Sequence, residues 1–185
     1  MTETQRIREA LVSYRSLLEP LLPAQIKEAK VMKALPTFFE DAGFCGVWRW
    51  WRHWDLYWPP HSGLRLIGEV KGPASPEFNP DDSRAHIGYI YADVSGRVQP
   101  DQRGDGMAQL HLYCWELGVP YGLFTNGDRM IIYHHVEPFD ERCFRAAAEN
   151  CDFPSSKILD LKLLSDDTDA VVERLARALA GLASH

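Results

Sequence analysis

Apolar side chains recur every three or four residues in four parts of this 185-residue chain, which is the spacing of amphipathic helices. The pattern predicts helices over residues 3–19, 24–41, 107–117 and 165–183, with a bend at Pro36 in the second. The positions expected to face the core are Ile7, Leu11, Tyr14, Leu18, Met107, Leu110, Cys114, Leu117, Val171, Leu175, Ala178 and Leu182.

Runs of aromatic and β-branched residues between turn residues predict strands in the middle of the chain. Asn126-Gly127 joins two of these runs, and Asn-Gly between apolar segments is a strong hairpin signal. The predicted strands cover residues 47–58, 64–71, 121–125 and 129–135, and residues 158–164 are either a strand or an extended arm. We therefore expect one α/β domain over residues 1–185, with an N-terminal helical segment at 1–23 and a central mixed sheet of four or five strands flanked by helices.

Three charged residues lie on the strands of the first predicted hairpin. Side chains alternate between the two faces of a strand, so Glu69 and Lys71 share a face and Val70 is buried behind them. If the turn is centred near Ser62, Asp55 lies opposite Glu69 on that face, at roughly 4.5–5.5 Å. Two carboxylates so close repel each other, and a divalent cation removes that repulsion. The pattern indicates a metal site with a lysine beside it; the alternative is a row of solvated charges.

Residues 72–106 interrupt the regular pattern with prolines and acidic residues, and so long a connection is uncommon unless it has a function. Because this insertion leaves and re-enters the fold beside the charged residues, we expect it to lie at the mouth of a site. Its arginines Arg84, Arg97 and Arg103 suit contacts with phosphate groups. A dimerisation arm is the alternative interpretation, and it predicts a homodimer.

Tryptophans crowd the first predicted strand. Counted as one continuous strand, the segment places Trp51 and His53 on the face of Asp55, where they are candidates for substrate contact. The other tryptophans fall on the opposite face, where we expect core packing, with base stacking on exposed rings as the alternative.

Charge and composition narrow the function classes. The net charge of −6 argues against strong nonspecific binding to nucleic acid, but it is compatible with an enzyme that has a local basic rim. The four cysteines have no paired spacing, so we expect neither a disulfide framework nor a zinc site. The chain has no apolar stretch of membrane-spanning length and its N-terminus lacks a signal-peptide core, so we expect a cytoplasmic protein with no membrane partner.

The segment from Gln109 to Gly127 carries the most specific pattern in the chain. It reads QLHLYCWELGVPYGLFTNG, a Gln-x-x-x-Tyr helix followed by Thr-Asn-Gly at a hairpin. Together with Asp55 and Glu69-Val70-Lys71, it resembles the PD-(D/E)XK nuclease superfamily, with the closest similarity to the N-terminal nuclease domain of type I restriction endonuclease motor subunits. The resemblance covers about residues 24–135 and implies a restriction-endonuclease-like core.

The resemblance implies a deoxyribonuclease that depends on Mg²⁺ or Mn²⁺ and acts in restriction, repair or phage defence. Asp55, Glu69 and the backbone carbonyl of Val70 would bind the metal, and Lys71 would position or deprotonate the attacking water. The auxiliary residues that the resemblance implies are Gln109 and Tyr113, to orient Lys71, water or a phosphate, and Glu28, with Glu40 as the alternative, to bind a second metal or orient a water.

The chain also departs from this family pattern. Trp54, not proline, precedes Asp55, and the segment before Gln109 is longer than is typical. No Gly-x-x-x-x-Gly-Lys-Ser/Thr phosphate loop is present, so we expect the nuclease to act on DNA alone or beside a separate motor or specificity protein. The alternative is a catalytically silent module of the same fold that binds nucleic acid or a partner protein.

Overall fold

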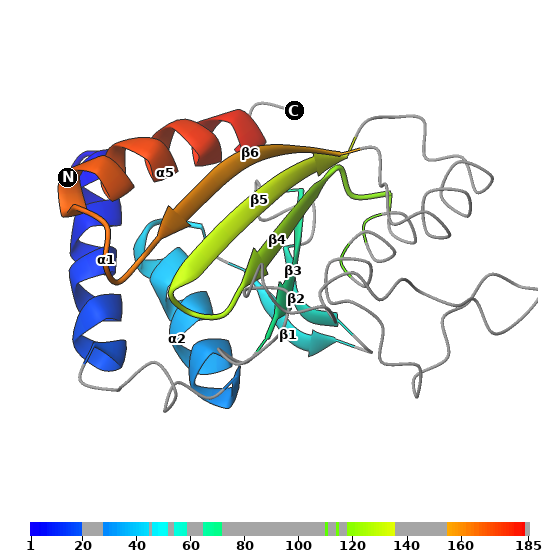
Figure 1. The fold of residues 1–185 in the computed structure, drawn as a ribbon, viewed down its shortest axis with the longest axis horizontal. Coiled ribbons are helices and arrows are strands. Elements are labelled where there is room, and N and C mark those ends of the chain that lie inside the picture. Colours follow the sequence, from blue (N-terminus) through cyan, green and yellow to red (C-terminus); the bar gives the residue numbers. More distant parts are fainter. Residues whose placement is uncertain are drawn as a thin grey trace, which may run out of the picture.

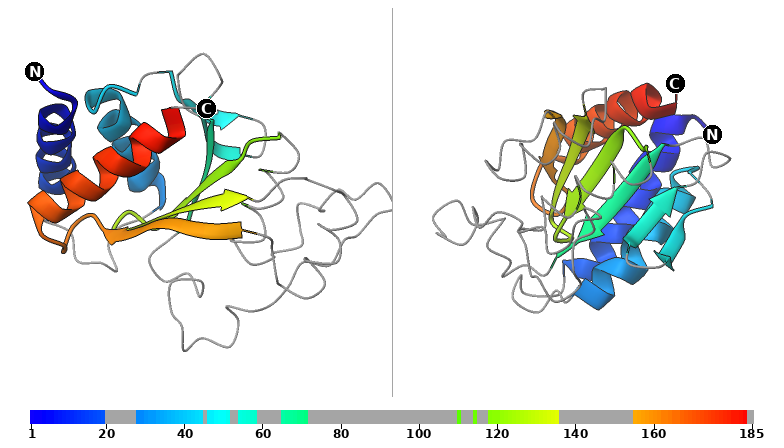
Figure 2. Two further views of the ribbon diagram at one scale, coloured as in Figure 1. Left: turned by 90° about the horizontal axis from the view of Figure 1, so that it is seen from above. Right: turned by 90° about the vertical axis from the view of Figure 1, so that its right-hand side faces the viewer.

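The computed structural model describes residues 1–19, 28–44, 46–51, 54–58, 65–71, 110, 114, 118–135 and 155–183. Within these ranges the chain is an α/β structure in which three long helices pack against one face of a mixed sheet (Figures 1 and 2). The helices are α1 (Glu3–Leu18), α2 (Glu28–Asp41) and α5 (Thr168–Ala183). The strands are β1 (Trp48–Trp51), β2 (Trp54–Trp58), β3 (Leu66–Val70), β4 (Tyr121–Thr125), β5 (Arg129–His135) and β6 (Ser155–Lys162).

The described strands lie side by side in the order β1-β2-β3-β4-β5-β6. β3 and β4 run parallel, and the other neighbouring pairs of described strands are antiparallel. The expected mixed sheet is confirmed, and it has six described strands in place of the expected four or five because residues 47–58 contribute two. Residues 47–58 do not form one strand: the chain reverses after β1, so that Trp51 pairs with Trp54 of β2.

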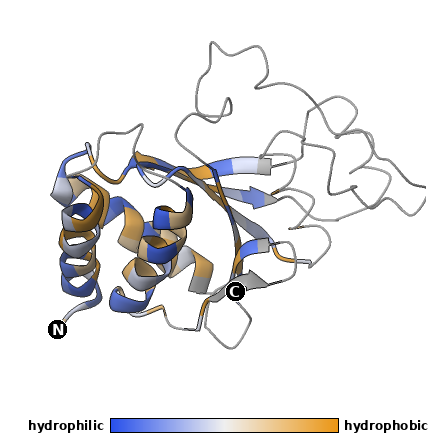
Figure 3. Ribbon diagram, turned by 90° about the horizontal axis from the view of Figure 1, so that it is seen from below, coloured by the Kyte–Doolittle hydropathy of each residue, from blue (hydrophilic) through white to orange (hydrophobic). Residues whose placement is uncertain are grey.

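The predicted apolar stripes of α1 and α5 lie in the main core, and Figure 3 shows hydrophobic stretches of the helices on the side of the sheet. The predicted stripe of α1 is completely buried, and so are most of the predicted positions of α5. Each large apolar side chain buried in this way contributes roughly 1.5–3 kcal/mol. Buried members of this core include Ile7, Leu11, Tyr14, Leu18, Leu35, Phe39, Leu56, Val70, Leu123, Ile132, Leu159, Val171, Leu175 and Leu182.

The helix ends follow from local chemistry. Thr2 caps α1 because its hydroxyl accepts the backbone N–H of Gln5 at 3.2 Å. Gly43 follows α2 with φ of 103°, a left-handed conformation that glycine adopts without strain, which confirms the predicted stop. Pro36 lies inside α2, as predicted. Among the described residues no helix is long and apolar enough to cross a membrane.

A second, smaller core covers the other face of the sheet. Leu110 and Cys114, both helical and fully buried, pack there with Ile67 and Phe124. The approach is close at Gly122, where an added Cβ would lie 2.9 Å from Leu110 Cγ and 3.0 Å from Cys114 Sγ. The helix predicted over residues 107–117 therefore presents the expected residues to the sheet at these two positions.

The predicted hairpin between β4 and β5 is confirmed with its predicted bounds. The Asn126 side chain accepts the N–H of Arg129 at 2.8 Å, and the Thr125 hydroxyl accepts the N–H of Gly127 at 3.0 Å. Gly127 has φ of 95°, which explains the need for glycine. The buried Tyr14 hydroxyl of α1 donates to the Gly127 carbonyl at 2.7 Å. The turn is thereby attached to the helical layer.

Candidate functional site

The register of β2 and β3 brings Asp55 and Glu69 together. Tyr57 pairs with Ile67, and Leu56 pairs with Gly68. Because the strands are antiparallel, one step back along β2 and one step forward along β3 place Asp55 opposite Glu69. The pairing is symmetric about residue 62, as the hairpin count predicted. The N–H of Val70 donates to Asp55 Oδ2 at 2.8 Å, which fixes that carboxylate beside the end of β3.

Lys71 completes the cluster from the end of β3. Its ammonium donates to Glu69 Oε1, so the two side chains meet on one face of the strand, as predicted. Val70 between them is buried in the helical core on the other face. The Lys71 N–H donates to the Thr125 carbonyl of β4 at 2.9 Å, so the cluster lies where the two parallel strands end. Ligand sites in α/β folds commonly occupy the carboxyl ends of parallel strands.

Burial changes the protonation of both carboxyl groups. It raises the pKa of Asp55 to about 6, and the charge of Glu28 adds to this increase, while the Val70 N–H and Lys71 oppose it. Burial also raises the pKa of Glu69 to about 8, reinforced by the charge of Asp55 and opposed by Lys71. A carboxyl group with a raised pKa binds its proton more tightly, because its charged form lacks solvation. Ionisation of both carboxyl groups therefore costs free energy in the folded protein.

The lysine is held in its charged form. Burial acts to lower the pKa of Lys71, but the charge and hydrogen bond of Glu69, with the charges of Asp55 and Glu28, outweigh burial and raise it above its usual value. The ammonium thus contacts Glu69 and also feels the charges of Asp55 and Glu28. When all of these groups are ionised, the site carries excess negative charge in a place poorly solvated by water, which favours binding of a cation.

Glu28 is the helical residue whose charge acts on all three members of the cluster. It is exposed and begins α2, whereas Glu40 lies about three turns further along that helix. Between these two candidates the structure favours Glu28. No three His, Cys, Asp or Glu side chains in the described parts of the chain are grouped closely enough to hold a metal ion. The acidic centre of the site is therefore the Asp55–Glu69 pair.

Gln109 and Tyr113 belong to the helix predicted over residues 107–117. Both residues lie outside the described residues, but Leu110 and Cys114, one position after each, pack against Ile67. Ile67 and Glu69 are two residues apart on β3 and therefore share a face. Leu110 and Cys114 consequently lie on the face of the sheet that carries the charged cluster.

The residues predicted to contact substrate are only partly described by the structure. The backbone pairing of Trp51 with Trp54, one position before Asp55, puts position 51 on the sheet face opposite to that of Asp55. The expectation that Trp51 shares the face of Asp55 is wrong, because the chain reverses between β1 and β2. The remaining candidates and the insertion lie outside the described residues: His53, Arg84, Arg97, Arg103 and residues 72–106.

One contact of the site was missed by the sequence analysis. Besides the backbone carbonyl that Val70 is predicted to offer a metal, its N–H donates to Asp55 Oδ2. The predicted pairing about residue 62 could have indicated this contact. It placed Asp55 opposite Glu69, and therefore near the backbone N–H of Val70. Comparisons of this chain with known protein families, curated proteins and solved structures find no match.

Proposed function

We propose that this protein is a metal-dependent nuclease that hydrolyses phosphodiester bonds in DNA. The observation that carries the proposal is the convergence of Asp55, Glu69 and Lys71 at the end of β3. Two carboxylates and one lysine supply the donors and the positive charge that phosphodiester hydrolysis needs. The resemblance of the Gln109–Gly127 segment to the PD-(D/E)XK pattern supports the same chemistry and a restriction-endonuclease-like core.

The residues present fit a hard divalent cation. Mg²⁺ is typically held by one or two carboxylates together with water and substrate phosphates, and the Asp55–Glu69 pair offers such a donor set. Asp55 and Glu69 would hold the ion with carboxylate oxygens, while Asp55 Oδ2 also accepts the Val70 N–H and Glu69 Oε1 also accepts from Lys71. A bound Mg²⁺ or Mn²⁺ would polarise the phosphodiester and make water a stronger nucleophile.

The chain's own groups then have distinct roles. The Val70 N–H orients Asp55, and the Glu69 carboxylate orients Lys71. The Lys71 ammonium would hold the attacking water or stabilise negative charge that develops on the phosphate. Glu28, exposed at the start of α2, would bind a second metal or orient a water. Gln109 and Tyr113 would orient Lys71 or a phosphate from their predicted helix.

The test is a cleavage assay on supercoiled, linear and single-stranded DNA with Mg²⁺, Mn²⁺ or EDTA. Asp55→Asn and Lys71→Met should lower the rate by about two to four orders of magnitude. Asp160→Asn and Lys157→Met are matched controls, because these residues form an ion pair on β6 of the same sheet. Both controls should cleave at the wild-type rate.

Two outcomes would contradict the proposal. Cleavage that persists in EDTA would show that the reaction does not require a metal. Equal rates for wild type and Asp55→Asn would show that Asp55 does not take part in catalysis. DNA binding by the wild type without cleavage of any substrate would instead support the catalytically silent module. Measuring DNA affinity beside the rate distinguishes these results.

A further inference from the structure

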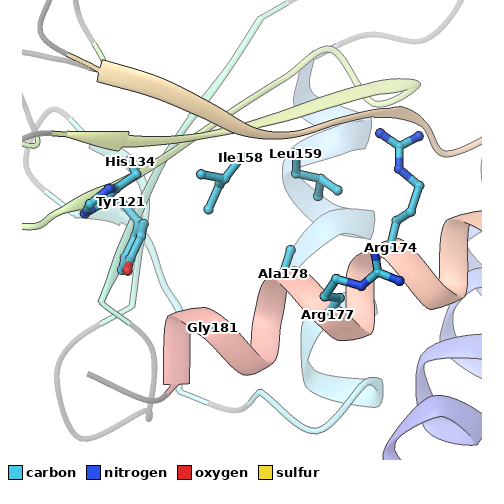
Figure 4. Close-up of a pocket in the computed structure, with 8 residues that line it drawn as sticks. All are labelled: Tyr121, His134, Ile158, Leu159, Arg174, Arg177, Ala178 and Gly181. Carbon is cyan, nitrogen blue, oxygen red and sulfur yellow. The ribbon is translucent and has the colours of Figure 1, made fainter.

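A cavity of about 380 Å³ lies between β6 and α5, on the helical side of the sheet (Figure 4). Tyr121, the first residue of β4, lines it. Asp55 and Glu69 lie instead beside the end of β3, where β4 also ends, and on the opposite face. The cavity is therefore separate from the charged cluster, and ligand binding in it is independent of the proposed function.

A β-bulge shapes the wall of this cavity. Ile132 pairs with Leu159 and Tyr133 with Lys157, so Ile158 has no partner on β5. The extra residue lets Ile158 and Leu159 both point into the cavity although they are consecutive, as Figure 4 shows. Leu159 is buried, but Ile158 is 43% exposed. A large apolar side chain is thus presented to the cavity without being covered by the described residues.

The two ends of the cavity differ in chemistry. Tyr121 and His134 form one end, with ring centroids 5.0 Å apart, and Arg174 and Arg177 come from α5 at the other (Figure 4). No Asp or Glu is among the described residues that line the cavity, although the protein carries a net charge of −6. This local reversal of charge favours an anion.

The arginines are held in place by different partners. Arg174 donates to the backbone carbonyl of Asp160 at 2.6 Å, which holds its guanidinium beside β6. Arg177 pairs with Glu173 one turn earlier at 2.7 Å, but both side chains are more than 70% exposed. An exposed pair of this kind contributes little, so an anionic ligand can replace Glu173 at low cost.

Gly181 lines the cavity near the end of α5. It lies inside α5, where glycine is less favourable than alanine by about 1 kcal/mol. A Cβ added at Gly181 would meet no atom within 4 Å, so close packing does not explain the glycine. The described residues therefore leave open space beside Gly181, across from Ile158 (Figure 4).

We infer that this cavity binds a small organic anion, with a carboxylate or phosphate held by Arg174 and Arg177 and an aromatic or aliphatic body reaching towards Tyr121 and His134. The cavity volume lies within the range of small-molecule sites, roughly 300–1,000 Å³. Ile158 and Leu159 cover one side of the body, and Ala178 and Gly181 leave room for it on the other. The aromatic end and the cationic end therefore match a ligand that has an aromatic or aliphatic body and an anionic group.

The experiment is calorimetric titration of the full chain in EDTA, so that the Asp55–Glu69 pair does not bind metal. The probes are 1-naphthyl phosphate and 1-naphthaleneacetate, with neutral 1-naphthalenemethanol and inorganic phosphate as partial ligands. At least one naphthyl anion should bind about tenfold or more tightly than either partial ligand. Arg177→Gln should weaken it by a similar factor, since hydrogen bonds to charged groups are the strong ones.

Gly181→Leu should abolish binding because its side chain fills the cavity, whereas Gly181→Ala should leave binding within about twofold. Arg8→Gln is the matched control for Arg177→Gln, because Arg8 forms an exposed ion pair with Asp169 and does not line the cavity. Equal affinity for the neutral alcohol and the anions would overturn the inference. So would anion binding that survives both Gly181→Leu and Arg177→Gln.

Discussion

Asp55 and Asp160 are aspartates on one sheet in opposite electrostatic settings. Burial raises the pKa of Asp55 to about 6. The hydrogen bond from Arg129, aided by Lys157, lowers the pKa of Asp160 to about 2 against a smaller opposing effect of burial. A raised pKa means that the ionised carboxylate destabilises the folded state near neutral pH, and a lowered pKa means that it stabilises it.

Asp55→Asn should therefore raise the melting temperature in EDTA at neutral pH, while Asp160→Asn should lower it. The amide of Asn still accepts the Val70 N–H and lacks the buried charge, so a gain of about 1 kcal/mol, or about 2–4 °C, is expected. Asp160 is 28% exposed, so water still screens its ion pairs with Arg129 and Lys157, and the loss should be about 1 kcal/mol or less. Thermal unfolding of the two variants beside wild type checks both signs. A lower melting temperature for Asp55→Asn would contradict the electrostatic account of the site.

Glu69 gives a pH dependence of defined sign. Its pKa is about 8 in the folded protein and about 4.5 when unfolded, so the unfolded state releases the proton first. Without a metal, the free energy of unfolding should therefore fall as pH rises between these values and become level above pH of about 8. Asp55 contributes a similar decline only up to its pKa of about 6, so Glu69→Gln should lack the part of the decline above about pH 6. Urea unfolding of both proteins at about pH 5, 7 and 9 measures it, and parallel pH profiles would count against the raised pKa.

At the scale of elements, two glycines differ in what surrounds them. Gly122 of β4 lies under the buried Leu110 and Cys114, whereas Gly181 of α5 faces open space. The first lets a helix approach the sheet closely, and the second leaves room beside a helix. The same substitution at both positions therefore separates close packing from helix propensity.

Gly122→Ala should lower the free energy of unfolding by about 1–3 kcal/mol, because its Cβ would lie 2.9 Å from Leu110 Cγ and force the helix outward. Gly181→Ala should instead be neutral or stabilising by up to about 1 kcal/mol, since the helix gains a better helix former. If the helix with Gln109 and Tyr113 contributes to the site, Gly122→Ala should also slow cleavage. Urea unfolding measures the free energy of unfolding of each variant. If Gly122→Ala is as stable as wild type, the added methyl group is accommodated without loss of stability, which would contradict this prediction.

At the scale of the whole molecule, the N-terminal helix holds the C-terminal part of the chain. Arg15 of α1 donates to the Leu163 carbonyl at 2.7 Å, the Thr168 hydroxyl at 2.7 Å and the Asp166 carbonyl at 2.5 Å. These acceptors lie in the turn between β6 and α5 and at the start of α5. The Arg15 side chain is 14% exposed, so the contacts are shielded from water.

Arg15→Met keeps the apolar stem but leaves these acceptors without their donor, and should lower the free energy of unfolding by about 2–3 kcal/mol. Arg8→Met is the matched control, because Arg8 joins the same two helices through an exposed ion pair with Asp169 and should cost less than about 1 kcal/mol. Urea unfolding of both variants makes the comparison. Equal losses would mean that the buried hydrogen bonds of Arg15 add nothing beyond surface charge.

What the sequence determined by itself is local. The apolar periods predicted α1, the end of α2 and α5, and Asn126-Gly127 predicted the β4–β5 hairpin, because these depend on backbone geometry over a few residues. The count about residue 62 also predicted that Asp55 would oppose Glu69, since alternation and turn length set an antiparallel register. The central part of the candidate site was therefore predictable.

Tertiary structure decided what depends on residues far apart in sequence. The reversal between β1 and β2 changed the face assigned to Trp51, and the bulge at Ile158 exposed a side chain that simple alternation does not identify. Burial of Asp55 and Glu69, and the action of Glu28 upon them, arise only when α2 and the sheet pack together. Desolvation and charge act through space, so no spacing along the chain encodes them.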